Sequence, residues 1–445
     1  MQSLRQCRRR IGDIRPTATR NLATVSPVVT AVRNHKVVVV GNGSAGVALS
    51  HQLLRKGKFA KDDIAVIDPA IWHHYQPGWT LVGCGLKDKK SLRKPMDGLA
   101  DEKLKFYNKS VATFHPSDNS LSLSDGDKIN YDQLVVAPGV RIDYSSVKGL
   151  SEAMADPDSL VASIYSYDHC DKVFKNIQRL KSGSAIFTQP TGVIKCAGAP
   201  QKIMWLALDH WRKAGLYQSG SDKSAINITF ATGLSAMFGV PKYSAKLEEL
   251  RKHRGVEGLF EHNLVSIDGN TATFARPNGQ DKVHRHFEFL HVAPRNVPHE
   301  FVSASELSNE AGYVDVDQHS LQHKKWNNVW SLGDAANLPT SKTVAAITSQ
   351  AVVLTQNILR NLEGKEVQPE YDGYTSCPLL TGEKKVLLAE FKYGGEPKET
   401  FNQWLGIDQA VPRRAFYHLK KDFFPWVYNM FHIKGQWGGP KGWIR

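Results

Sequence analysis

A glycine-rich turn between a short apolar strand and an amphipathic helix constrains this chain more than any other feature. Residues 36–40 form a β-branched run, the turn Gly41-Asn-Gly-Ser-Ala-Gly46 follows, and residues 47–54 have helical periodicity. A second strand, at 64–67, ends in Asp68, 22 residues beyond the last glycine, where an acid that binds a ribose is expected. The glycines let backbone N–H groups approach a pyrophosphate at the positive end of the helix. GxGxxG alone is a weak signal, but this context predicts a βαβ unit that binds a dinucleotide.

Two later segments resemble the flavin-contact segments of flavoproteins with two dinucleotide-binding domains. Residues 133–139 read as a strand that ends in Pro-Gly. Residues 328–334 read as a strand that ends in Gly-Asp, ahead of a helix that begins near Ser341. In such flavoproteins the aspartate reaches the ribityl chain, and the helix points its N-terminus at the flavin. The resemblance implies FAD, not NAD, as the first dinucleotide.

The predicted fold class is α/β, with two Rossmann-like dinucleotide-binding domains and a C-terminal membrane-associating region. A length of 445 residues suggests two or three domains. We expect a discontinuous FAD-binding domain, 35–155 and 310–365, with the second Rossmann-like domain, 156–309, inserted into it. Residues 366–445 form the C-terminal region.

The inserted domain has the outline of a second βαβ unit but lacks what a nicotinamide dinucleotide needs. The turn at 189–200 follows its first strand without a GxGxxG, and its second strand runs into Thr232-Gly233 without an acid. That turn instead carries Cys196, just ahead of a helix predicted from about 200 to 213. A helix N-terminus stabilises a thiolate and lowers its pKa. A lone cysteine is more often a small buried apolar residue, but the lost nicotinamide site favours a redox role.

Basic charge is concentrated at the N-terminus. The net charge is +14, and residues 1–34 supply +6 of it through seven arginines and one aspartate. This Arg-rich stretch with Ser and Thr predicts a mitochondrial presequence; a basic tail without structure is the alternative. Only the charge favours nucleic acid, and no recognised nucleic-acid-binding module occurs, so we expect no such partner.

The five cysteines make an odd number, with no CxxC and no Cys/His spacing typical of zinc sites. We therefore expect neither a disulfide-stapled secreted fold nor a metal. Cys84 is interpreted as a packing residue. In a reducing compartment, a pair that does oxidise is more often catalytic than structural.

The last 34 residues, from Pro412 to Arg445, combine nine aromatic residues and seven Lys or Arg with one acid, Asp422. This composition suits an amphipathic segment with its rings at headgroup depth and its cations toward anionic lipid. A core element with a solvated basic face is the alternative. No apolar run reaches the roughly 18 residues that a membrane-spanning helix needs, so the protein is expected to lie on a membrane surface.

Four separated motifs together resemble the mitochondrial sulfide:quinone oxidoreductases. They are Val193-Ile-Lys-Cys-Ala-Gly-Ala-Pro-Gln-Lys-Ile-Met204, Asn337-Leu-Pro-Thr-Ser-Lys-Thr343, Tyr371-Asp-Gly-Tyr-Thr-Ser-Cys-Pro378 and Gly435-Gln-Trp-Gly-Gly-Pro440. The similarity runs from about residue 35 to the end. The family carries non-covalent FAD, and the expected location is the mitochondrial inner membrane, peripheral or monotopic, on the matrix side.

The resemblance implies that Cys196 and Cys377 are the redox pair of this chain. Hydrogen sulfide would attack their bridge, a disulfide or a trisulfide, and leave a persulfide on Cys377 and a thiolate on Cys196 that faces the flavin. FAD would pass two electrons to a quinone, with ubiquinone expected, and the sulfane sulfur would move to an acceptor such as glutathione. Glu152 matches a carboxylate that accepts a proton near the cysteines; a solvated loop glutamate is the alternative.

For FAD the same resemblance points to the turn, the acid, and residues of the later segments. They are Gly41, Gly43, Ser44, Ala45, Gly46, Asp68, Gln76, Val111, Gly139, Asp334, Lys342, Val344 and Lys420. Lys342 and Lys420 are expected beside the flavin or quinone, where cations stabilise an anionic reduced flavin. Asp68 departs from the glutamate of many relatives, and its shorter side chain can still reach a ribose.

Two other classes of protein would keep the FAD motifs. A type II NADH:quinone dehydrogenase needs the intact second fingerprint that this chain lacks. A flavin-bearing interaction protein needs no reactive cysteine pair. Sulfide and NADH, added without oxygen, distinguish the three.

Overall fold

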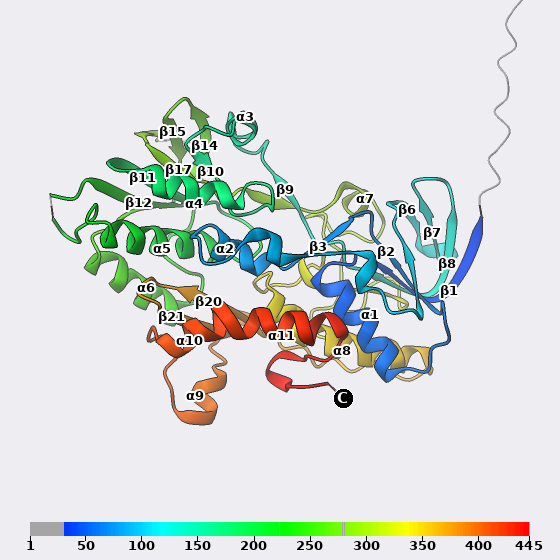
Figure 1. Cartoon of the computed structure of the whole chain (residues 1–445). Coiled ribbons are helices and arrows are strands. Elements are labelled where there is room, and N and C mark those ends of the chain that lie inside the picture. Colours follow the sequence, from blue (N-terminus) through cyan, green and yellow to red (C-terminus); the bar gives the residue numbers. More distant parts are fainter. Residues whose placement is uncertain (1–30, 222, 278, 280, 445) are drawn as a thin grey trace, which may run out of the picture.

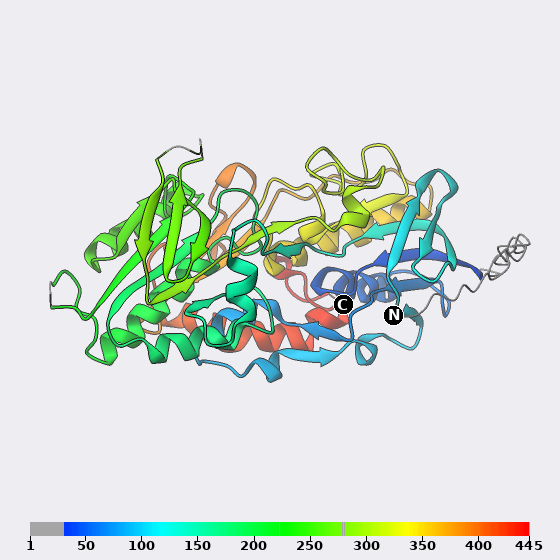
Figure 2. The ribbon, with the colours of Figure 1, turned by 90° about the horizontal axis from the view of Figure 1, so that it is seen from above.

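Two mainly parallel β-sheets, each covered by helices, form two lobes that lie side by side (Figures 1 and 2). The computed structural model describes residues 31–221, 223–277, 279 and 281–444. The expected presequence lies outside the described residues up to residue 30. From Val32 onward the chain already belongs to the first strand of the first lobe.

The first lobe holds a seven-stranded sheet. Its parallel strands, in spatial order, are β5 (Leu104–Tyr107), β2 (Ile64–Ile67), β1 (Val32–Val40), β8 (Lys128–Val136) and β19 (Val329–Ser331). The other half of β8 pairs with β7 (Ser120–Leu123), which pairs with β6 (Val111–His115). Because β19 lies almost 200 residues beyond β8 in the chain, this sheet is discontinuous in sequence, as the expected FAD domain is.

Strand β1 is longer than the apolar run that predicts it. Its first residues, from Val32, pair with β8 from Lys128 although their side chains are largely exposed. The last four residues, Val37–Val40, are buried because both neighbouring strands and the covering helices enclose them. Hydrophobicity therefore reveals only the enclosed half of the strand.

The second lobe repeats this arrangement. Its parallel strands, in spatial order, are β10 (Val161–Ala162), β17 (Phe289–His291), β11 (Gly183–Gln189), β12 (Ile226–Thr232) and β13 (Glu257–Phe260). An antiparallel meander of β14 (Asn263–Asp268), β15 (Thr271–Ala275) and β16 (Val283–His286) follows β13. The chain enters and leaves the lobe through two paired strands, β9 (Arg141–Asp143) and β18 (Arg295–Val297).

The longer helices cover the sheets, and the shorter ones connect them. They are α1 (Ser44–Lys56), α2 (Trp79–Val82), α3 (Leu150–Ala155), α4 (Cys170–Arg179), α5 (Ala199–Lys213), α6 (Pro241–His253), α7 (Glu300–Ser303), α8 (Val344–Leu362), α9 (Thr400–Leu405), α10 (Arg414–His418) and α11 (Phe424–Met430). Helices α1 and α8 pack on each other in the first lobe. Helix α5 confirms the helix predicted after Cys196.

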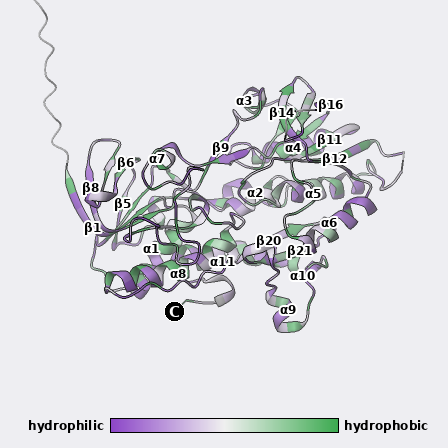
Figure 3. Cartoon of the chain, turned by 180° about the vertical axis from the view of Figure 1, so that it is seen from behind, coloured by the Kyte–Doolittle hydropathy of each residue, from purple (hydrophilic) through white to green (hydrophobic). Residues whose placement is uncertain are grey.

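The C-terminal region ties the two lobes together. The hairpin of β20 (Thr375–Leu380) and β21 (Val386–Phe391) packs into the core of the second lobe. Helix α10, a π-turn (Leu419–Phe423) and α11 then run along one side of both lobes, and the chain ends against α1 and α8 (Figures 1 and 2). Helix α9 projects from the body (Figure 3). Within the described ranges, no helix combines the length and apolarity that crossing a bilayer requires.

Candidate active site

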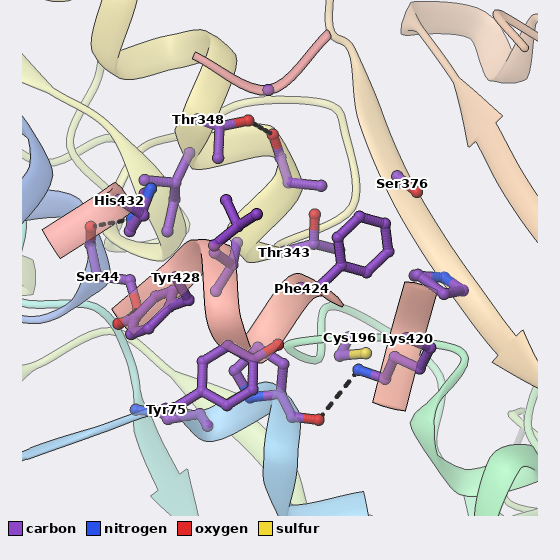
Figure 4. A pocket seen from close by; sticks show the side chains of 18 of the residues that line it. Ser44, Tyr75, Cys196, Thr343, Thr348, Ser376, Lys420, Phe424, Tyr428 and His432 are labelled. Atoms are coloured by element: carbon purple, nitrogen blue, oxygen red, sulfur yellow. Dashed lines mark hydrogen bonds between the residues drawn. The ribbon is translucent and has the colours of Figure 1, made fainter. Parts of the chain in front are cut away.

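A cavity of about 600 Å³ is lined by residues of both lobes and of the C-terminal region (Figure 4). Its walls include the N-termini of α1 and α8, the loop from β11 to α5, strand β20 and the C-terminal helices. Ten of the residues singled out from the sequence line it: Gly43, Ser44, Ala45, Gln76, Gly139, Cys196, Asp334, Lys342, Val344 and Lys420.

The turn before α1 presents bare backbone to this cavity. A Cβ atom on Gly41, where φ is +95°, would lie 2.4 Å from the carbonyl oxygen of Ala137, and one on Gly46 would lie 1.8 Å from the carbonyl oxygen of Gly41. These two glycines therefore shape the turn and do not line the cavity. Gly43 has open space beside it and caps α1 without a side-chain hydrogen bond. The first N–H groups of α1 are left free to bind an anion, as a pyrophosphate site requires.

Asp68 lies at the end of β2 and fixes the same turn. Its carboxylate accepts hydrogen bonds from the backbone N–H groups of Asn42, at 2.6 Å, and Ala70, at 2.8 Å. Burial raises the pKa of Asp68. Asp68 lies beside the cavity, not in its lining, and Val111 is buried in the core of the first lobe.

The segment that leads from β19 into α8 brings a cation and an acid to the cavity. The Lys342 ammonium donates to the backbone oxygens of Asp334, at 2.7 Å, and Ala336, at 3.1 Å, and lies over the ring of Tyr313. Burial lowers the pKa of Lys342 to about 8, and burial raises the pKa of the Asp334 carboxyl. Thr343 caps α8 by accepting from the N–H of Ala346.

The structure brings Cys196 and Cys377 together. Cys196 lies in the loop from β11 to α5 with a φ of +52°, and its N–H donates to the carbonyl of Lys342 at 2.8 Å. Cys377 lies in β20 and is 2% exposed. Their thiols are hydrogen-bonded to each other. Gly198, two residues after Cys196, packs against Cys377: a Cβ atom there would be 2.7 Å from the Cys377 sulfur.

Lys202 faces both sulfurs, and the sequence analysis missed it. Its ammonium, on a side chain only 1% exposed, donates to Cys196 Sγ at 3.3 Å and is also hydrogen-bonded to Cys377. The hydrogen bond from Cys377, together with Lys202 and Lys420, holds the pKa of Cys196 well below its ordinary value. The same bond raises the pKa of Cys377. Cys196 is therefore the thiolate of the pair. The sequence did offer a signal for Lys202, because this lysine stands among mostly apolar residues in the first turns of α5.

Two more lysines approach the cysteines. Lys420 lies in the π-turn, a feature frequent at functional sites, and donates to the carbonyl of Pro77 at 3.1 Å (Figure 4). Burial and neighbouring Lys202 lower the pKa of Lys420 to about 8. Lys195, which sequence reasoning also missed, donates to Gln76 Oε1 at 2.8 Å, and burial lowers its pKa to about 8.

Two other candidates lie away from this chemistry. Glu152 is exposed on α3 and is not among the residues that line the cavity. Cys84 is enclosed by apolar side chains, and burial raises the pKa of its thiol, as expected for a packing residue.

Aromatic side chains line the rest of the cavity. Phe401 and Trp404 come from α9, and the others come from the C-terminal helices and the final loop: Phe423, Phe424, Tyr428, Trp437 and Trp443. Trp404 is 66% exposed and Trp443 is 51% exposed. This wall can hold a flat apolar molecule and leaves hydrophobic side chains on the surface around it.

The fold and the site define a redox protein of the two-dinucleotide-domain class. Residues 35–186 match the pyridine nucleotide-disulphide oxidoreductase family. Over 434 residues, the chain is 44% identical to the mitochondrial sulfide:quinone oxidoreductase of Schizosaccharomyces pombe, with 93% of each protein covered. It is 42% identical to the protein of that name in Dictyostelium discoideum, over 91% of this chain and 87% of the relative.

The chain belongs to the family of mitochondrial sulfide:quinone oxidoreductases. Membership of this family implies a flavin cofactor. The solved sulfide:quinone oxidoreductase of Aquifex aeolicus superimposes with a TM-score of 0.71 at 17% identity, over 89% of this chain and 91% of that one. This likeness confirms the predicted fold class.

Proposed function

We propose that this protein is a mitochondrial flavoenzyme that oxidises hydrogen sulfide at the Cys196–Cys377 pair and passes two electrons through FAD to a quinone. One observation carries the proposal: two cysteines that are 181 positions apart in the sequence lie close together and both interact with the buried ammonium of Lys202. Cys196 and Lys202 line a cavity whose other walls have the features of a dinucleotide site. Family membership supports the same reaction.

The residues around the cavity fit an FAD molecule. The uncapped N-terminus of α1 and the open space at Gly43 suit a pyrophosphate. Gly139, with a φ of +75°, also leaves open space toward the cavity. Asp68 is the proposed ribose partner beside that turn. When bound, FAD accepts two electrons from the cysteine pair and delivers them to the quinone.

The sulfur chemistry begins on the oxidised pair. The hydrosulfide ion attacks the Cys377 sulfur and forms a new S–S bond to it. The Cys196–Cys377 bond breaks at the same time, and Cys196 leaves as a thiolate. Lys202 stabilises that thiolate by its charge and hydrogen bond. An acceptor thiolate such as glutathione, or a second hydrosulfide ion when sulfide alone is added, then takes the outer sulfur of the Cys377 persulfide and leaves a Cys377 thiolate. The Cys196–Cys377 bond then closes again and gives up two electrons.

We place the quinone ring, proposed to be ubiquinone, against the aromatic wall from Phe401 to Trp443, with its tail toward lipid. Exposed tryptophans on α9, α11 and the final loop support association with a membrane surface. The proposed location is the matrix face of the mitochondrial inner membrane, reached with the N-terminal presequence that precedes β1. We also propose that the chain divides into an FAD-binding domain, 35–155 with 310–365, an inserted domain, 156–309, and a C-terminal region, 366–445. The two separate parallel sheets support this division.

A type II NADH:quinone dehydrogenase is not favoured. The loop from β11 to α5, where a nicotinamide dinucleotide would need its own glycine-rich turn, is occupied by Cys196 and its contacts. The other end of that site, after β12, offers Thr232 and no acid.

Anaerobic titration tests the proposal. Sulfide should bleach the flavin of the wild-type protein, and NADH should not. Cys196→Ser and Cys377→Ser should each abolish sulfide-dependent quinone reduction, whereas Cys170→Ser, a buried thiol on α4, should leave it intact. Full turnover in either of the first two variants would refute the mechanism.

A further inference from the structure

A hydrogen-bonded chain links the C-terminal helix α11 to the turn before α1. Its members at the cavity, Ser44 and Tyr428, lie next to each other in Figure 4, with Ser44 Oγ and the Tyr428 hydroxyl 2.7 Å apart. The same hydroxyl is 2.7 Å from His73 Nε2. The other ring nitrogen of His73 is 3.0 Å from the carbonyl oxygen of Asn42. His73 and Tyr428 are each 3% exposed.

The direction of each bond in this chain is fixed by its carbonyl end. Because a carbonyl only accepts, His73 Nδ1 carries the proton. Burial lowers the pKa of His73 to about 4, so the ring is neutral and Nε2 accepts from Tyr428. The Tyr428 oxygen in turn accepts from the hydroxyl of Ser44. The hydroxyl hydrogen of Ser44 is therefore used in the bond to Tyr428, and toward the cavity Ser44 Oγ can only accept a hydrogen bond.

His432 also uses one ring nitrogen to donate to a backbone carbonyl of the turn before α1, as His73 does. Its Nε2 is 3.0 Å from the carbonyl oxygen of Ser44, so this nitrogen donates and Nδ1 is an acceptor. His432 is 1% exposed, and it lines the cavity. Its Nδ1 is buried and has no protein partner among the described residues. A buried acceptor without a donor costs free energy, so this atom points to a ligand donor.

We infer that the C-terminal segment supplies part of the cofactor site, with Ser44 Oγ and His432 Nδ1 accepting hydrogen bonds from hydroxyls on the sugar portion of the flavin nucleotide. The inference rests on the proposed flavin function and adds two residues of the segment to it. Tyr428 is a positioning residue, since it acts through Ser44. The backbone N–H groups of the turn suit phosphate oxygens, whereas the two acceptors suit only donors.

Flavin retention tests the assignment. His432→Phe keeps an aromatic ring against Tyr428 and removes both ring nitrogens, so the acceptor is lost. Tyr428→Phe removes one hydroxyl. Each variant should raise the dissociation constant for FAD about tenfold, the usual scale for one buried hydrogen bond. The constants are measured by flavin fluorescence during reconstitution, beside the melting temperature of the flavin-free protein. His418→Phe, at an exposed histidine on α10, is the matched control and should bind FAD as the wild type does.

The outcomes separate the two levels of the proposal. A wild-type protein that holds no FAD would contradict the proposed function itself. A wild-type protein that holds FAD, with His432→Phe and Tyr428→Phe binding it equally tightly, would overturn this inference alone. Added salt should leave the tenfold ratio unchanged, because hydroxyls carry no charge. A ratio that shrinks with salt would identify phosphate as the partner and overturn the assignment to hydroxyls.

Discussion

Replacing Lys202 by methionine isolates the electrostatic contribution of one buried cation to the sulfur chemistry. Lys202 donates to Cys196 Sγ at 3.3 Å, also contacts Cys377, and is 1% exposed. Methionine has nearly the same length and fills the same space without charge or donor. The packing of α5 is therefore preserved while the thiolate loses its closest cation.

The size of the effect follows from the burial of the pair. A hydrogen bond to a charged group contributes about 1.5–3 kcal/mol, and solvent screens this one little. Losing it should slow sulfide-driven flavin reduction roughly 10- to 150-fold at neutral pH. Since Lys202 helps to keep the pKa of Cys196 low, its removal raises that pKa. The thiolate then forms only at higher pH, and the rising limb of the pH profile moves upward.

Anaerobic stopped-flow measurement of flavin bleaching, repeated across the pH range in which the protein is folded, checks both effects. Lys213→Met is the control, because Lys213 lies on the same helix with a side chain 63% exposed. Its rate and profile should match the wild type. A Lys202→Met protein with the wild-type rate and an unmoved pH profile would show that the cation does not stabilise the thiolate.

Two further perturbations probe other parts of the site. Gly198→Ala places a Cβ atom 2.7 Å from the Cys377 sulfur and 2.4 Å from Leu379 Cδ2. Because this displaces the sulfurs from each other, the rate of sulfide-dependent flavin bleaching should fall at least about tenfold. The FAD content, read from the visible spectrum, should be unchanged. An unaffected rate would contradict the close packing. Trp404→Ser with Leu405→Ser removes two side chains that are 66% and 67% exposed on α9. The affinity of the double variant for anionic vesicles, measured by co-sedimentation, should fall roughly tenfold while bleaching of its flavin by sulfide persists. An unchanged affinity would exclude α9 as a membrane contact.

The local parts of this molecule could be predicted from its sequence. The strand before Gly41, the turn, α1 and Asp68 follow from periodicity and glycine spacing, since neighbouring residues alone decide them. The helix after Cys196 was equally clear. Strand β1 was predicted too short, because its exposed half is held by pairing with β8 and carries no hydrophobic signal.

The parts that depend on tertiary contacts could not be predicted. Lys202 belongs to a residue type that usually lies on the solvated face of a helix, and only the fold shows that this one is enclosed. Cys377 lies in a hairpin that follows both lobes in the sequence and packs into the core of the second lobe, which Cys196 also contacts. The spacing of the two cysteines in the sequence therefore could not show that they pair. Glu152 shows the converse, because a matching motif did not bring its side chain to the cavity. The contact between His432 and Ser44 joins residues 388 positions apart.

The position of β20 sets the order in which this centre can assemble during synthesis. Chains emerge from the ribosome N-terminus first, and domains fold as they emerge. The first sulfur, on Cys196, is made with the second lobe, but its partner arrives only with the hairpin after residue 374, when both sheets are complete. Lys420 and His432 follow later still. A chain interrupted before that hairpin would carry Cys196 without its partner, so the capacity to handle sulfide is acquired only by the finished polypeptide.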